Sequence, residues 1–277
     1  MYWGTDDTMS QNKRITHIDT LRGIAVLLMV MVHAAATWNP FETVQPTLIA
    51  YVVSGLGGLA APMFVTLFGW GIVRSQMNLK PRVFQASFLF TAQVLVNLTS
   101  PHLFNPFTPG ILSLMGLLTL ILPFFAPKIK ASSIQLLLVT TVLFFTLQIL
   151  FPELQGMGKW SDRVSDDSIF IIISNVLLTG TYPLFPWILF ALLGSTISFQ
   201  NHDPKQTLPQ TKLTYSALGV GLLFCLATFL YSQYNNDLWA HPTADAYLTF
   251  FPANSAFIVA ATTGVLLIWT FIQRYEL

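Results

Sequence analysis

The chain has 277 residues, of which 53% are hydrophobic and 9% are charged, and its formal net charge is +1. Soluble domains carry about 25% charged residues, so this composition excludes an ordinary water-soluble fold and suits lipid as the solvent. The small net charge and the lack of a long Lys/Arg cluster in the sequence exclude nucleic acid as a partner. A single cysteine, Cys225, excludes an intrachain disulfide, and no spacing of His, Asp and Glu indicates a metal.

Eight apolar stretches are long enough to cross about 30 Å of hydrocarbon as helices. They lie at residues 18–38, 57–73, 83–99, 109–125, 132–151, 182–197, 213–232 and 254–273. Two shorter apolar runs, 48–53 and 169–178, are expected at the outer interface. The sequence therefore predicts an all-α integral membrane protein with a bundle of about eight transmembrane helices. Residues 1–12 are predicted to be a disordered tail and residues 13–277 a single transmembrane domain.

The basic residues give the orientation, because Lys and Arg of short loops concentrate on the cytoplasmic side. With a cytoplasmic N-terminus, ten Lys and Arg residues fall in the inner segments and two, Lys159 and Arg163, fall in outer loops. This pattern predicts a multi-pass cell-membrane protein with both termini cytoplasmic. The start of the chain also has features of a signal peptide, but the later charge pattern requires the first segment to remain as a span.

The first span contains three ionisable residues on one stripe. Asp19, Arg22 and His33 lie within about 60° of one another around a helix with 100° per residue. Thr16 and Asp19 have the spacing of a capping box, which is the structural alternative for Asp19. Arg22 could snorkel to the headgroups, whereas His33, about 16 Å further along the axis, is too short to do so. His33 is therefore either a hydrogen-bonded packing residue or a functional one.

At these residues the sequence resembles a known family. The segment from Arg14 to His33 resembles the opening span of membrane acyltransferases related to heparan-alpha-glucosaminide N-acetyltransferase. Residues 61–70 (APMFVTLFGW) resemble the second span of that family, and residues 182–194 (YPLFPWILFALLG) resemble its later Pro-Trp span.

The resemblance implies transfer of an acyl group, most often acetyl, from cytoplasmic acyl-CoA to a saccharide hydroxyl or amine on the extracytoplasmic side. It further implies that Arg22 and Arg14 hold the CoA phosphates, with Asp19 beside them, and that His33 is the catalytic base. Imidazole suits proton abstraction, and the planar fork of Arg suits phosphate. The expected partners are acetyl-CoA, a saccharide acceptor and membrane lipid, and a homo-oligomer is left open.

Other residues have competing interpretations. Trp187 is expected either to anchor the sixth span at the headgroups or, by the resemblance, to stack on a sugar. His102 and His241 each lie next to a proline in outer loops, where solvation is favoured over a role in an acceptor site. Asn97 begins a glycosylation signal, but it is expected to lie too close to the bilayer for modification. The Gly-rich second span, with Gly55, Gly57, Gly58, Gly69 and Gly71, predicts close helix packing.

Two other functions compete with acyl transfer. A polar stripe that runs from the inner to the outer face could line the path of a transporter or flippase for a lipid-linked or acylated substrate. Inverted repeats with broken helices would indicate that function, and the sequence shows none convincingly. The third possibility is a non-catalytic assembly subunit.

Overall fold

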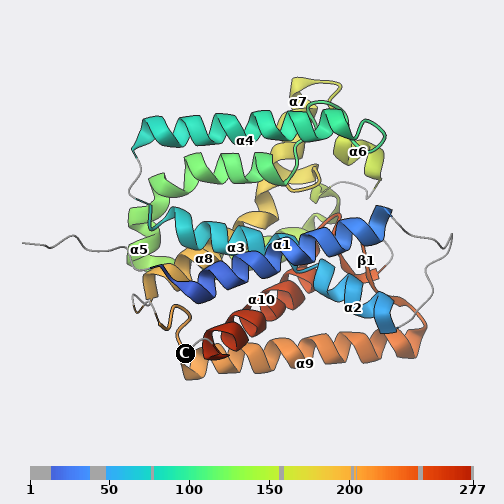
Figure 1. The fold of residues 1–277 in the computed structure, drawn as a ribbon. Helices are drawn as coiled ribbons and strands as arrows, with labels where there is room; N and C mark the ends of the chain where they lie inside the picture. The colour runs from blue at the N-terminus through green and yellow to red at the C-terminus, as the bar shows by residue number, and fades with distance from the viewer. Residues whose placement is uncertain are drawn as a thin grey trace, which may run out of the picture.

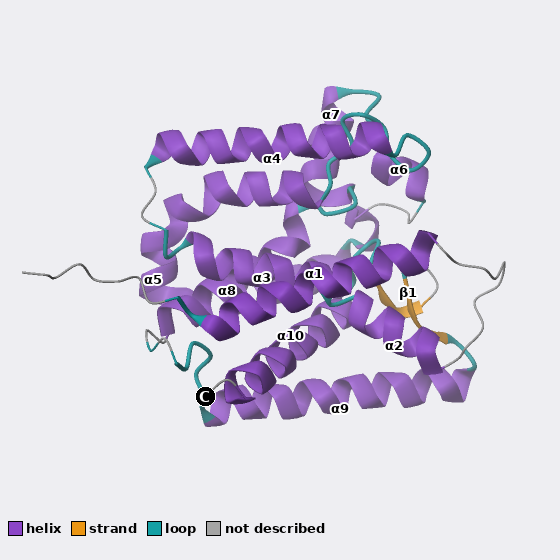
Figure 2. Ribbon diagram, viewed as in Figure 1, coloured by secondary structure: helices purple, strands orange, loops and turns teal. Residues whose placement is uncertain are grey.

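The computed structural model describes residues 14–37, 48–75, 78–155, 159–200, 203, 205–242 and 246–275. The predicted disordered tail, residues 1–12, lies outside the described residues. Helices dominate the described chain, and a small two-stranded sheet lies at one end of the bundle (Figure 2). The prediction of an all-α protein is thus confirmed, apart from this short sheet, which the sequence did not reveal.

The elements follow one another in a simple order, and Figure 1 shows their arrangement. The helices are α1 (Thr16–Thr37), α2 (Leu48–Gly57), α3 (Ala60–Ile72), α4 (Leu79–Thr99), α5 (Ile111–Leu150), α6 (Trp160–Val164), α7 (Ile169–Ser174), α8 (Leu184–Gln200), α9 (Lys212–Asn235) and α10 (Ser255–Tyr275). The short turns η1 (Pro152–Gln155) and η2 (Asn175–Thr179) flank α6 and α7, and strands β1 (Leu238–His241) and β2 (Ala246–Thr249) precede α10.

Every predicted span coincides with a helical segment, and the two predicted interfacial runs coincide with α2 and with α7 and η2. By length and hydropathy alone, five described helices could cross a membrane, or six if the bent pair of residues 169–179 and 184–200 forms one span. Helix α5 counts once in that number, although it contains two of the predicted spans.

Helix α5 folds back on itself. A straight helix of its 40 residues would be about 60 Å long, twice the hydrocarbon thickness. The backbone leaves helical geometry at Ser132, next to the stretch that contains Pro127. Thr181 Oγ1 donates to Pro109 O at one end of α5, and Gln148 Oε1 accepts from Ser255 N near the other. Both ends of α5 therefore lie near the sheet, and its two arms are separate helices.

Helices α3 and α8 pack closely, and two glycines allow the approach. A Cβ on Gly69 would lie 2.1 Å from Ala191 O, and a Cβ on Gly194 would lie 1.8 Å from Thr66 O. Only glycine fits where two backbones are this close. The prediction of close packing is thus confirmed for Gly69, and the sequence did not identify Gly194 as its counterpart.

A buried arginine stabilises the loop segments between α5 and α8. Arg163 is 2% exposed, and its guanidinium donates to the carbonyl oxygens of Gln155, Thr179 and Gly180 at 3.0, 2.9 and 3.3 Å. Burial lowers the pKa of this guanidinium from its ordinary value. Arg163 is therefore a structural cation, fixed by backbone carbonyls.

Asn97 joins α4 to the loop that follows it. Its side chain is 1% exposed, accepts from Gln93 Nε2 at 2.9 Å and donates to the carbonyl oxygens of Pro106 and Thr108. Burial in this hydrogen-bond network, together with the expected nearness to the bilayer, excludes the amide from glycosylation in the folded protein.

Candidate functional site

The start of α1 carries a cluster of three charged side chains, which we call the arginine cluster: Arg14, Asp19 and Arg22. The two carboxylate oxygens of Asp19 are divided between the arginines, since Arg14 Nε contacts Oδ2 and Arg22 Nη1 donates to Oδ1 at 3.1 Å. The sequence predicted that Asp19 and Arg22 share a face, and the structure confirms it. The cluster has a net charge of +1 from two arginines and one carboxylate.

The arginine cluster is open to an incoming anion. The side chain of Arg14 is 83% exposed and that of Arg22 is 50% exposed, and a shallow depression is lined by Arg14, Thr16, Asp19 and Thr20. Arg22 Nη2 lies 3.6 Å from the place where a Cβ on Gly71 would stand, so the glycine leaves the guanidinium room beside α3. A guanidinium has five N–H donors, and the carboxylate engages few of them. Donors of both exposed guanidinium groups are therefore left over from the ion pairs with Asp19.

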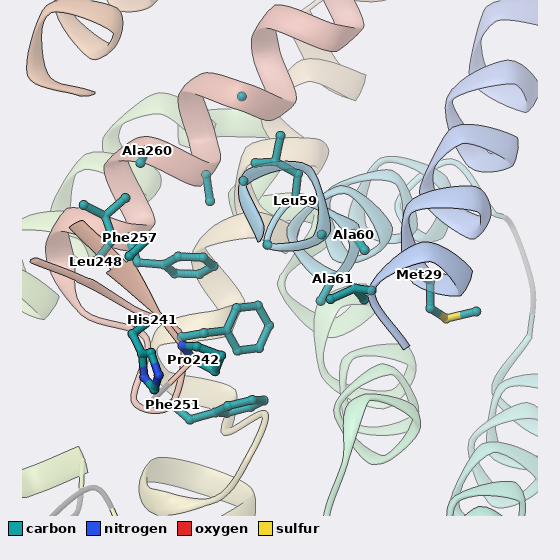
Figure 3. A pocket seen from close by; sticks show the side chains of 18 of the residues that line it. Met29, Leu59, Ala60, Ala61, His241, Pro242, Leu248, Phe251, Phe257 and Ala260 are labelled. Carbon is teal, nitrogen blue, oxygen red and sulfur yellow. The ribbon is translucent and has the colours of Figure 1, made fainter. Parts of the chain in front are cut away.

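A cavity of about 430 Å³ lies at the other end of the bundle. Its walls come from α1 through Met29 and Val32, from the α2–α3 junction, from α9 and α10, and from the two-stranded sheet. Figure 3 shows Met29 on one side and His241, Pro242 and Phe251 on another. Its volume lies in the range of small-molecule sites, which are mostly apolar with a few polar groups.

Small residues make room for the cavity, and aromatic rings form much of its wall. Gly55, Gly57 and Gly58 line it where α2 meets α3, so part of the glycine-rich stretch surrounds a cavity and does not serve helix packing alone. A Cβ on Gly57 would stand 2.7 Å from a Val32 methyl carbon, which shows how closely α1 passes the junction. The aromatic lining residues are Phe64, Tyr182, Trp239, Phe250, Phe251 and Phe257.

His33 lies on α1 one turn after Met29. Its side chain is exposed, and its Nδ1 lies 2.8 Å from Met29 O. His33 does not belong to the described residues that line the cavity, although Met29 and Val32 of the same helix do. Its role as the catalytic base stays a prediction.

Trp187 is not a headgroup anchor, and that interpretation is wrong. The side chain is fully buried, and its ring centroid lies 4.9 Å from that of Tyr182, 5.2 Å from Phe250 and 5.5 Å from Phe190. A belt tryptophan would face the lipid headgroups, whereas this indole is enclosed by other rings. The predicted contact with a sugar would require those rings to move.

The two proline-flanked histidines differ. His102 is exposed in the loop between α4 and α5, as predicted. His241 is partly buried at the end of β1 and lines the cavity, so it is less exposed than His102. The sequence gave no signal of this, because the wall opposite His241 is formed by α1, about 200 residues earlier in the chain.

The fold and the site define a helical membrane protein with the arginine cluster at one end of its first helix and an apolar cavity toward the other. The chain belongs to the family described as "Heparan-alpha-glucosaminide N-acetyltransferase, catalytic", whose sequence model matches residues 14–234, more than half of the chain. A comparison with curated proteins finds no significant match. The family identifies the chain as an acyltransferase of the membrane. The matched residues include the arginine cluster and His33, and they end before β1, β2 and α10.

Proposed function

We propose that this protein moves an acyl group, acetyl in the first instance, from cytoplasmic acyl-CoA to a saccharide hydroxyl or amine on the far side of the cell membrane. In this arrangement the chain crosses the membrane eight times with both termini cytoplasmic. The arginine cluster then faces the cytoplasm and the cavity lies toward the far side. The excess of basic residues at the inner segments supports this orientation.

The observation that carries the proposal is the layout of α1 within the matched family segment. Arg22 and Met29 are seven residues apart, which is about 10 Å along the helix axis at 1.5 Å per residue. The phosphates and the thioester of acyl-CoA lie at opposite ends of one long, flexible molecule. Along one helix, the arginine cluster is thus placed to hold the phosphates of the donor, and the cavity wall is placed to hold its thioester.

Each group has a defined task in the transfer. Arg22 and Arg14 bind the CoA phosphates through charge-assisted hydrogen bonds, while Asp19 keeps the two guanidinium groups in place. The cavity excludes water and positions the thioester against the acceptor. A base removes the acceptor proton, the role that the family resemblance gives to His33.

Calorimetry with acetyl-CoA and the detergent-purified protein tests the phosphate site. We expect saturable binding, and we expect Arg22→Ala to raise Kd by about 10- to 100-fold, since a hydrogen bond to a charged group contributes about 1.5 to 3 kcal/mol. Lys130→Ala is the matched control, because Lys130 is an exposed cation at the bend of α5 and lies outside the cluster.

Sealed right-side-out vesicles test the orientation in the same experiment. Acetyl-CoA enclosed inside should support transfer to a glucosaminide outside, whereas acetyl-CoA added outside should not. The reverse result would contradict the orientation. A folded protein that binds no acetyl-CoA would contradict the acyltransferase and favour the transporter.

A further inference from the structure

The wall of the cavity contains few side chains that can take part in proton transfer. Among the described lining residues, the titratable groups are the phenol of Tyr182, the thiol of Cys225 and the imidazole of His241. Phenols and thiols ordinarily hold their protons at pH 7, whereas an imidazole is largely neutral there and accepts one. His241 is therefore the group in this wall that is suited to act as a base.

The sheet fixes the position of His241. Strand β1 pairs with β2 in parallel, and the register places His241 opposite Thr249. The residue after it, Pro242, accepts a hydrogen bond from Phe251 N at 2.7 Å, and Phe251 itself lines the cavity. A side chain at the end of a paired strand is held more precisely than one on an open loop, which is what a catalytic group requires.

The two proposed reactants can meet near this imidazole. Met29 and Val32 bring α1 to the opposite wall, so a donor held at the arginine cluster reaches the cavity along α1. In the proposed orientation the acceptor arrives from the far side of the membrane, and His241 lies across the cavity from Met29 (Figure 3). His33, by contrast, is exposed and does not belong to the described lining of the cavity.

We infer that His241, at the end of β1, is a catalytic residue that removes the proton from the saccharide acceptor inside the cavity. This inference rests on the proposed acyl transfer and moves the role of the base from His33 to His241. The acceptor oxygen or nitrogen attacks the thioester carbonyl carbon as His241 takes its proton. The new C–O or C–N bond forms, the C–S bond breaks, and the CoA thiolate leaves. The imidazolium then returns the proton to that thiolate, so the products are the acylated saccharide and CoA thiol.

The test compares three histidines in the detergent-purified full chain. Release of CoA thiol from acetyl-CoA is measured with an alkyl α-glucosaminide as the acceptor, for the wild type and for His241→Ala, His33→Ala and His102→Ala. General acid–base catalysis contributes about 10²- to 10⁴-fold, so we expect His241→Ala to lower kcat by that factor. His102→Ala is the matched control, because His102 is also flanked by a proline but is exposed outside the cavity, and it should retain wild-type kcat.

Two further readouts separate catalysis from structure. Exogenous imidazole should restore part of the kcat of His241→Ala, since a small base can enter the cavity that the variant enlarges, and it should leave His102→Ala unchanged. Acetyl-CoA binding by calorimetry should stay near the wild-type affinity in His241→Ala. If His241→Ala does not fold, His241→Gln replaces it, and we expect the same loss of kcat because an amide cannot accept the proton.

Several outcomes would overturn the inference. A folded His241 variant with wild-type kcat would do so, as would a loss that imidazole does not restore, or a loss confined to His33→Ala. The proposed function fails in a different way, because the wild type would then release no thiol, and the inference would fall with it.

Discussion

The two ends of α1 lie in different surroundings. At its start, Arg14 and Arg22 are well exposed, and among the described residues the carboxylate of Asp19 is their one ion-pair partner. At the other end, Met29 and Val32 line a cavity whose wall is largely apolar and includes several aromatic rings. Exposed ion pairs contribute little to stability, whereas enclosed apolar surface contributes much. We therefore interpret the arginine cluster as a feature for binding, in line with the proposed function, while the cavity is space that the core leaves unfilled.

A second comparison supports this interpretation. Arg163 is a cation that does serve the fold, since it is buried and donates to three backbone carbonyl oxygens. The arginines of the cluster have half or more of their side chains exposed. A buried guanidinium that donates to backbone carbonyl oxygens stabilises the fold. An exposed guanidinium keeps N–H donors that a ligand can use.

The largest effect is expected where α3 and α8 meet, because α3 contacts both ends of the site. Gly71 of α3 faces Arg22, and Ala60 and Ala61 of the same helix line the cavity. In Gly194→Ala the new Cβ would collide with Thr66 O, a backbone atom that cannot move alone. We expect a loss of about 3 kcal/mol or more in the free energy of unfolding, measured by thermal melting in detergent. Acetyl-CoA binding and transfer should fall together.

Gly219→Ala is the matched control for this prediction. A Cβ on Gly219, in α9, would meet no atom within 4 Å, so the substitution should be neutral or stabilise by up to about 1 kcal/mol through helix propensity. Equal melting temperatures for the two variants would show that the close contact between α3 and α8 at Gly194 does not stabilise the fold.

A smaller effect, confined to one end, is expected when the cavity is filled. Ala260 lines the cavity from α10, and Ala260→Phe would place a ring in it. We expect transfer to the glucosaminide to fall by about 10²-fold, because small displacements of reacting groups cost that much. The Kd for acetyl-CoA should change far less, since the phosphates bind at the arginine cluster. Thiol release and calorimetry on one preparation measure both quantities.

The control for the filled cavity is the same substitution on an exposed face. Ala217 of α9 is exposed, and Ala217→Phe should leave transfer and binding unchanged. Full transfer by a folded Ala260→Phe would remove the cavity from the mechanism.

The smallest effect is expected at Trp187. Trp187→Phe removes an indole N–H that has no hydrogen-bond partner among the described residues and leaves a small void. These two changes oppose each other, so the free energy of unfolding should change by about 1 kcal/mol or less. The KM for the glucosaminide should also stay constant, because the ring is enclosed. A higher KM with unchanged stability would instead support the predicted sugar contact.

Local patterns predicted the helices and the nearness of Asp19 to Arg22 well. The eight apolar runs coincide with helical segments. The residues within each run are enough to predict a helix, so no contact with the rest of the chain has to be known. Asp19 and Arg22 are neighbours because they are three residues apart on one helix. The division of α5 into two arms could also be predicted from the sequence, because two prolines and two lysines interrupt the apolar run before Ser132.

Long-range contacts determined what the sequence could not predict. His102 and His241 have the same kind of local sequence, and only the packing of α1 and the sheet around His241 distinguishes them. Trp187 lies at the end of a predicted span, where a tryptophan is typical of a headgroup anchor. In the fold, Phe250 and Phe257, more than 60 residues later, help to enclose its ring. Arg163 was counted as a loop cation because its carbonyl partners cannot be inferred from residue type.

The burial of Asn97 has a consequence for production of the protein in a host that attaches glycans. The amide is accessible to a glycosylating enzyme only until α4 and residues 106–108 come together, because afterwards both partner carbonyls and Gln93 occupy it. A glycan on Asn97 would thus mark chains that were modified before this part of the protein folded. The mobility of the band on a gel would then report the order of events during synthesis.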